Sequence, residues 1–289
     1  MALIDSGVRD NADIAPRVRF RKDFTGEGDG DGYGHGTHTA GIIASSGQGS
    51  YVAGATTFIG MAPGAEIIDL KVLGADGTGE VVNVIAAIDF AVAQRERLDI
   101  RIINLSLGHP VSDGTYRDDP LAKAVERAVK AGIVVICSAG NLGKTDDGTP
   151  VVGAIVSPGY TPGAITVGAL NTRGTVARSD DAVTSYSSRG PVGNPDDPST
   201  WGDQAGPGRA EQRDRLDRRG PASYLWNNYP ERQVYGANGG TYFTLSGVEH
   251  GGRGGRRTPW RNCSRAWRSS RRGKSSSRCG MEALSMASA

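Results

Sequence analysis

The chain has 289 residues and a net charge of only +2, which allows one substantial globular domain and excludes a uniformly basic or acidic protein. The charge is unevenly spread, because the residues from Gly251 onward include nine arginines, one lysine and one glutamate. This tail therefore carries +9 and the rest of the chain −7, a clear break in composition. No apolar stretch is long enough to span a membrane, and the spacing of the three cysteines indicates neither a metal site nor a disulfide framework.

The first predicted element is an apolar strand, residues 2–5, which ends on Asp5 and is followed by a glycine turn. Residues 10–32 are polar and acidic, and we interpret them as a solvated surface loop. A structural calcium site is the alternative, although the bidentate glutamate of a calcium loop is absent at the expected offset. His35 then opens a predicted buried helix, and the small residues around it let another backbone come close. A histidine held in this way suits a general base.

Strands and helices alternate along the next part of the chain. The predicted strands are apolar runs at residues 66–73, 100–107, 133–137 and 164–168. Apolar residues recur at helical spacing at Val81, Ile85, Ile88 and Val92, and again at Leu121, Ala124, Val125, Ala128 and Val129. Cys137 falls within one of the strands, where we expect it to be a small core residue. The alternation predicts an α/β fold with a parallel sheet, and ligands of such sheets bind beyond the carboxyl ends of the strands.

Three motifs stand at such strand or helix ends: A-L-I-D-S-G with Asp5, G-H-G-T-H-T-A-G with His35, and S-A-G-N with Asn141. In this order they resemble the motifs of the subtilisin-like serine proteases, the subtilase or peptidase S8 family. The resemblance implies a three-layer fold, in which helices flank a central parallel sheet, and hydrolysis of peptide bonds by an Asp–His–Ser triad. It implies that Asp5 orients His35 and that the Asn141 amide donates into an oxyanion hole. The alternative for Asn141 is a turn-forming residue in a loop.

The same resemblance assigns a peptide-binding role to two segments. The stretch N-L-S-L-G, residues 104–108, is similar to the strand of the family to which an extended substrate adds by backbone hydrogen bonds. The alternative is a plain buried strand end. The second segment is the S-A-G stretch before Asn141. The expected substrate-binding residues are Ser106, Leu107, Gly108, Ser138, Ala139 and Gly140.

The nucleophile is where the sequence departs from the family. The family serine lies in a G-T-S-M-A motif that opens an apolar helix, whereas this chain reads V-E-H-G-G after Gly247. Ser246 stands just before that glycine, where the family does not keep its nucleophile. Codons for V-E-H-G-G, shifted by one nucleotide, can read S-S-M-A, and residues 202–210 can likewise be shifted into a family segment. We therefore interpret residues 1–247 as an incomplete peptidase domain, residues 202–222 as a non-native patch, and residues 248–289 as an out-of-frame, disordered basic tail.

We expect this chain to be an inactive member of a serine endopeptidase lineage that lacks its nucleophile. The alternatives are a non-catalytic peptide-binding remnant and an unstable fragment. Nucleic-acid binding through the tail, where Trp260 and Trp267 lie among arginines, is the least favoured hypothesis. The expected partner is a peptide or protein, with no nucleic acid, no membrane and no required cofactor, and the chain is expected to be a monomer. The resemblance implies an extracellular location, although no signal peptide precedes the first strand, which indicates that upstream sequence is missing.

Overall fold

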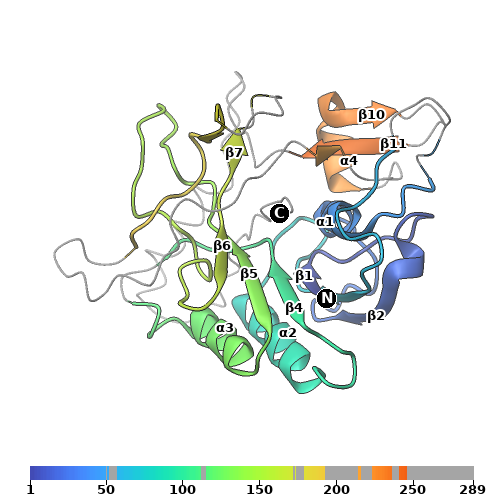
Figure 1. The fold of residues 1–289 in the computed structure, drawn as a ribbon, viewed down its shortest axis with the longest axis horizontal. Coiled ribbons are helices and arrows are strands. Elements are labelled where there is room, and N and C mark those ends of the chain that lie inside the picture. The colour runs from blue at the N-terminus through green and yellow to red at the C-terminus, as the bar shows by residue number, and fades with distance from the viewer. Residues whose placement is uncertain are drawn as a thin grey trace.

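The structure is a computed structural model, and its centre is a parallel six-stranded sheet with the strand order β2-β3-β1-β4-β5-β6 (Figure 1). All five strand pairs in this sheet are parallel. The strands are β1 (Ala2–Asp5), β2 (Val18–Asp23), β3 (Ile67–Lys71), β4 (Ile102–Leu105), β5 (Val134–Ser138) and β6 (Ile165–Val167). The structure describes residues 1–49, 51, 57–111, 115–171, 173, 179–192, 214–215, 223–235 and 241–245.

Helices cover both faces of this sheet, which confirms the predicted α/β architecture. The helices are α1 (His35–Ala44), α2 (Val81–Ala93) and α3 (Pro120–Lys130). On β1, Ala2 and Ile4 pack with residues of α2 and α3, whereas Leu3 packs with α1. Successive side chains of a strand point to opposite faces, so Asp5 lies on the same face as Leu3. The catalytic strand predicted from the sequence therefore presents its carboxylate toward α1.

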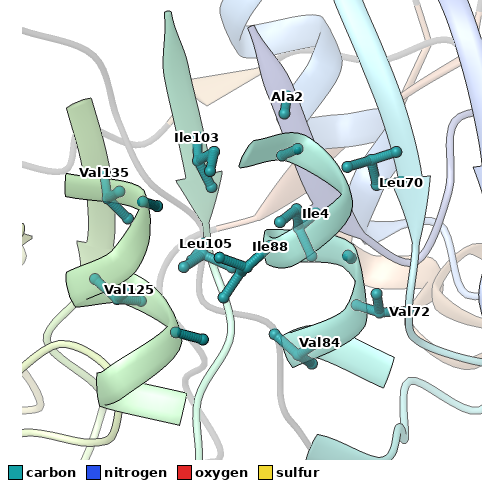
Figure 2. Packing of buried hydrophobic residues seen from close by; sticks show 14 of the residues in the cluster. Ala2, Ile4, Leu70, Val72, Val84, Ile88, Ile103, Leu105, Val125 and Val135 are labelled. Atoms are coloured by element: carbon teal, nitrogen blue, oxygen red, sulfur yellow. The ribbon is translucent and has the colours of Figure 1, made fainter. Parts of the chain in front are cut away.

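The larger core lies between the sheet and the helices α2 and α3. Figure 2 shows Ile4 and Leu105 from two neighbouring strands meeting Ile88 of α2, with Val125 of α3 beside them. All four side chains are fully buried. Burying each such side chain contributes about 1.5–3 kcal/mol, so this layer supplies much of the stability of the sheet. The expectation that Cys137 is a core residue is also confirmed, because it is fully buried in this cluster.

Two details of the sequence prediction were wrong. The stretch 10–32 is not all loop, since β2 forms the edge of the sheet within it. None of its six residues is fully buried, and Phe20 stacks on Phe90 of α2 with ring centroids 5.7 Å apart. The buried stripe of α2 is also displaced, running through Val84, Ala87, Ile88 and Ala91. The predicted residues Val81, Ile85 and Val92 are half-buried along its border.

Several short elements lie outside the central sheet. The strands β10 (Gln233–Tyr235), β11 (Thr241–Leu245) and β9 (Asp214–Arg215) form an antiparallel sheet, and β7 (Leu170–Asn171) pairs with β8 (Ala182–Val183). The described elements also include the helix α4 (Tyr224–Asn228) and two 3-10 helices, Ala15–Arg17 and Pro230–Arg232. None of the helices in this described part of the chain has the length and apolar character needed to cross a bilayer.

Three sequence predictions concern residues that the structure leaves largely or wholly undescribed. Within the patch 202–222, only Asp214 and Arg215 are described, and they pair with β11. Ser246 and the basic tail 248–289 lie outside the described residues. The division of the chain into an incomplete domain, a non-native patch and a tail therefore stays a prediction.

Candidate active site

The end of β1 and the start of α1 bring a carboxylate and an imidazole into contact. His35 is the first residue of α1, and its Nδ1 lies 2.9 Å from both Oδ1 and Oδ2 of Asp5. Both side chains are buried, with Asp5 at 0% and His35 at 3% relative exposure. The backbone N–H of Ser6 donates to Asp5 Oδ1 over 2.7 Å, which fixes the carboxylate. The two residues predicted to form the acid–base pair are therefore neighbours.

The contact with Asp5 determines what the other ring nitrogen of His35 can do. When Nδ1–H donates to the carboxylate, Nε2 carries the lone pair and can accept a proton. Nε2 is buried and has no hydrogen-bond partner among the described residues. A buried polar atom without a partner costs free energy, and such atoms are often found where a reacting group belongs. Nε2 is the atom that would take a proton from a nucleophile.

Glycines allow the segments around this pair to approach closely. A Cβ added at Gly36, next to His35, would lie 2.2 Å from the carbonyl oxygen of Gly7. A Cβ at Gly7, which has a φ of +96°, would lie 2.3 Å from the carbonyl oxygen of Gly30. Gly7 is two residues after Asp5, so the first contact sets the separation of the β1 turn from α1 and the second sets its separation from the acidic loop. The small residues noted around His35 in the sequence therefore have a steric cause.

We expect Gly36→Ala to push α1 away from the β1 turn. The new methyl group meets backbone, which cannot rotate away as a side chain can, so the fold should lose about 1–3 kcal/mol of unfolding free energy. Urea denaturation followed by circular dichroism measures this loss. The matched control is Gly64→Ala, because a Cβ at Gly64 has nothing within 4 Å. Superimposable denaturation curves for Gly36→Ala and the wild type would contradict this steric argument.

Asn141 follows β5 after a glycine with left-handed backbone. Gly140 has a φ of +108°, and its carbonyl accepts a hydrogen bond of 2.8 Å from the backbone of Ser188. The Ser188 hydroxyl in turn accepts from the Leu142 N–H over 2.9 Å, so Asn141 is held between two anchored residues. Its Nδ2 is buried without a hydrogen-bond partner in the described residues. Such an amide is free to donate to a ligand, as the predicted oxyanion role requires.

The three strand ends lie at one edge of the sheet. β1 pairs with β4 and β4 pairs with β5, all in parallel, so their carboxyl ends face the same way. Neighbouring strands are about 4.8 Å apart, which places the ends of β1 and β5 about 10 Å from each other. Asp5 and the segment that leads to Asn141 therefore flank the end of β4, where Ser106 lies. This is the edge at which parallel sheets bind ligands.

The two predicted peptide-binding segments adjoin this edge. Ser106 and Leu107 follow β4 and are fully buried, and the Ser106 hydroxyl accepts from Asn104 Nδ2 over 2.9 Å. Gly108 touches the Ser157 segment, where an added Cβ would lie 2.6 Å from the carbonyl oxygen. The following residue, His109, exchanges two backbone hydrogen bonds with Ser157. These contacts fix the 106–108 segment beside the Ser157 segment, beyond the end of β4.

On the other segment, the backbone of Ala139 is already used within the protein. Its N–H donates to Val167 over 2.8 Å and its carbonyl accepts from Val156 over 2.9 Å. Ser138 ends β5, and its hydroxyl is buried without a hydrogen-bond partner among the described residues. Gly140 is the remaining member of this predicted set, and its carbonyl is bonded to Ser188. The side-chain polar groups without a partner here are the Ser138 hydroxyl and the Asn141 Nδ2, among the described residues.

Three carboxylates of the acidic loop 23–31, those of Asp23, Glu27 and Asp31, bind the protein itself. The Asp23 carboxylate accepts hydrogen bonds from Thr25 and Gly28, and these bonds lower its pKa against the opposing effect of burial. Glu27 accepts from the Ala75 N–H over 3.0 Å. In the described part of the chain, no group of three or more His, Cys, Asp or Glu side chains is arranged to hold a metal ion. A structural calcium ion stays an untested expectation.

Sequence reasoning did not single out two residues next to the pair, Ser6 and Asp31. Both are buried and both bind the first turn of α1. The available signal was an aspartate shortly before a predicted helix, a position where carboxylates cap free N–H groups. His38, expected to be structural, is fully buried within α1.

Comparison with known proteins supports the resemblance to the subtilases independently of the geometry. The family model described as the subtilase family, Peptidase_S8, matches residues 1–241. The chain belongs to the subtilase family. Among its relatives, the serine protease AprX of Bacillus subtilis is 34% identical over 254 residues, covering 86% of this chain and 53% of AprX. An intracellular serine protease of Paenibacillus polymyxa is 36% identical, covering 59% of this subtilase and 49% of the relative.

A solved structure shows the same fold. Sphericase superposes with a TM-score of 0.60 at 28% sequence identity, covering 85% of this chain and 71% of that one. The expectation of a subtilisin-like fold is therefore confirmed. This subtilase spans about half the length of the two curated relatives above, 53% and 49%.

Proposed function

We propose that this chain carries the acid, the base and the oxyanion donor of a serine endopeptidase acting on peptide or protein substrates. The observation that supports this most is the paired contact of His35 Nδ1 with both Asp5 oxygens, which leaves a buried Nε2 open. Asp5 would stabilise the imidazolium that forms when Nε2 takes a proton, and Asn141 Nδ2 would donate to the oxyanion of the tetrahedral intermediate. Membership of the subtilase family agrees with these roles.

We further propose that the chain hydrolyses peptides little or not at all, because no serine occupies the expected motif after Gly247. No hydroxyl of the described residues is bonded to His35 Nε2. Cys137 offers no substitute, since it is fully buried and burial raises the pKa of its thiol above the ordinary range. His35 would then have only water to deprotonate.

A fluorophosphonate probe tests the missing nucleophile, because it labels only an activated serine. We expect no adduct on this protein under conditions that label an intact subtilisin fully. His35→Ala serves as the matched variant, since any adduct formed through this site must disappear with the imidazole. An adduct that maps to a serine and requires His35 would overturn the proposal of inactivity while supporting the roles of Asp5 and His35.

Other expectations stay predictions. They include a monomeric state, the peptide-binding roles of the segments 106–108 and 138–140, and the absence of nucleic-acid binding. An extracellular location is also a prediction, since two relatives, from Paenibacillus polymyxa and Bacillus subtilis, are named intracellular serine proteases.

A further inference from the structure

Asp31 is a buried carboxylate that binds both sides of the Asp5–His35 contact. It is 2% exposed, and its two oxygens each accept two hydrogen bonds. Oδ1 accepts from the Ser6 hydroxyl over 2.9 Å and from the Gly34 N–H. Oδ2 accepts from the N–H and the hydroxyl of Thr37, over 2.8 Å and 2.6 Å. One carboxylate therefore joins the end of β1 to the first turn of α1.

Ser6 completes the link on the β1 side. Its hydroxyl donates to Asp31 and accepts from the Gly36 N–H over 2.9 Å. Its own N–H donates to Asp5 Oδ1, the oxygen that also contacts His35. The first N–H groups of a helix have no partner within the helix, so external acceptors must satisfy them. In α1 these acceptors are Ser6 and Asp31. Ser6 donates its N–H to Asp5, and Asp31 is linked to Asp5 through the Ser6 hydroxyl.

We propose that Asp31 is a positioning residue, which acts through Ser6 and the first turn of α1 to hold the His35 ring within hydrogen-bond distance of Asp5. The inference rests on the proposed roles of Asp5 and His35. Asp31 touches neither of these two side chains in any described hydrogen bond, so it acts through its neighbours. A negative charge at this end of a helix is also favourable, because the helix dipole is positive there.

The hydrogen-bond pattern requires a carboxylate and not merely a polar side chain. All four groups that face Asp31 are donors, two on each oxygen. An asparagine has one acceptor oxygen and one donor NH₂, so either orientation points the NH₂ at a backbone N–H, that of Gly34 or that of Thr37. The hydroxyls of Ser6 and Thr37 can rotate and accept from that NH₂, but a backbone N–H can only donate, so a pair of opposed donors remains. Asp31→Asn thus keeps the shape of the side chain and disrupts the network.

The test uses the intact chain labelled with ¹⁵N-histidine and follows the Nδ1–H resonance of His35 by NMR. His35→Ala identifies this signal among the four histidines. We expect Asp31→Asn to speed exchange of this proton with water by about tenfold, the size of effect that loss of a cap has on local opening. Ser6→Ala removes the hydroxyl that bonds both Asp31 and the Gly36 N–H, and it should give a smaller increase in the exchange rate. The readout requires no hydrolysis, so it is independent of the missing nucleophile.

The matched control is Asp119→Asn. The Asp119 carboxylate caps α3, accepting from the N–H groups of Leu121 and Ala122, and it lies in another part of the fold. We expect this variant to leave exchange of the His35 proton unchanged. Equal acceleration of exchange in both variants would mean that the effect comes from general destabilisation. No acceleration in Asp31→Asn would mean that Asp31 does not hold His35 in place. Either result overturns the proposal. Absence of the resonance from the wild type would contradict the Asp5–His35 pair itself.

Discussion

The purified chain is expected to hydrolyse a peptide p-nitroanilide about 10⁶-fold more slowly than an intact subtilisin at equal concentration. The factor is the one measured in subtilisin itself, a member of the same family, when the nucleophile alone is removed. We expect that Asp5 and His35 do not compensate, because no hydroxyl of the described residues is bonded to Nε2 and an acyl-enzyme needs one there. In subtilisin without its triad, the oxyanion donor and substrate binding still retain about 10³–10⁴ over the uncatalysed reaction in water.

Two variants show whether any residual rate comes from this site. Asn141→Ala should lower a genuine residual rate by about 10²–10³, the cost of removing one oxyanion donor. His35→Ala should lower it less, since the base has no nucleophile to activate. A rate that neither variant changes belongs to a contaminating protease. A rate within about a hundredfold of intact subtilisin that His35→Ala abolishes would mean that another hydroxyl serves as the nucleophile.

The layers of the fold were predictable because the strands and helices have distinct periodicities. The strand 2–5 and the helices at 81–92 and 121–129 were identified from apolar runs and helical spacing, and the parallel sheet followed from their alternation. The edge strand β2 was not predicted because three of its six residues are basic and none of the six is fully buried. The buried stripe of α2 was misplaced because nearly every position of this helix is apolar, so spacing alone could not select the face.

The candidate site was only partly predictable. The motif order suggested Asp5, His35 and Asn141, but the contact between the first two depends on residues far apart in sequence. Asp31 lies 25 positions from Ser6, and the bond between them forms only after β1 and α1 pack together. A local pattern cannot show that all four groups around one carboxylate are donors. Nor can it show that the glycines at positions 7 and 36 meet backbone from other segments.

Replacing Asp69 with asparagine is expected to change how stability depends on pH. Asp69 lies in β3 at 4% exposure, and burial raises its pKa to about 7. Arg21 and the Val8 N–H act in the opposite direction and lower this pKa, whereas repulsion from Asp31 and Asp5 raises it further. Its Oδ2 accepts from Val8 over 3.0 Å and from Arg21 over 3.2 Å. Its Oδ1 is buried without a hydrogen-bond partner among the described residues. The ionised form is therefore the costly one.

The direction in which the free energy of unfolding changes with pH follows from proton binding. Between the ordinary value of 3.8 and about 7, folded Asp69 holds a proton that the unfolded chain has released. The free energy of unfolding therefore falls as pH rises through this window, and the contribution, about 4 kcal/mol at most, is present below 3.8 and lost above 7. Asp69→Asn keeps one oxygen for Val8 and Arg21 and never ionises. We expect it to be more stable than the wild type above pH 7, and to lose this advantage as the pH falls.

Urea denaturation of both proteins above pH 7 and near pH 4 measures this change as a difference between variant and wild type, so that other acid effects cancel. Asp29→Asn is the control, because Asp29 is an exposed aspartate of the acidic loop and its effect should stay within about 0.5 kcal/mol at both pH values. If the advantage of Asp69→Asn is the same at both pH values, Asp69 does not change protonation in this range. If the variant is less stable above pH 7, the ion pair with Arg21 outweighs the burial of the charge, and the raised pKa is wrong.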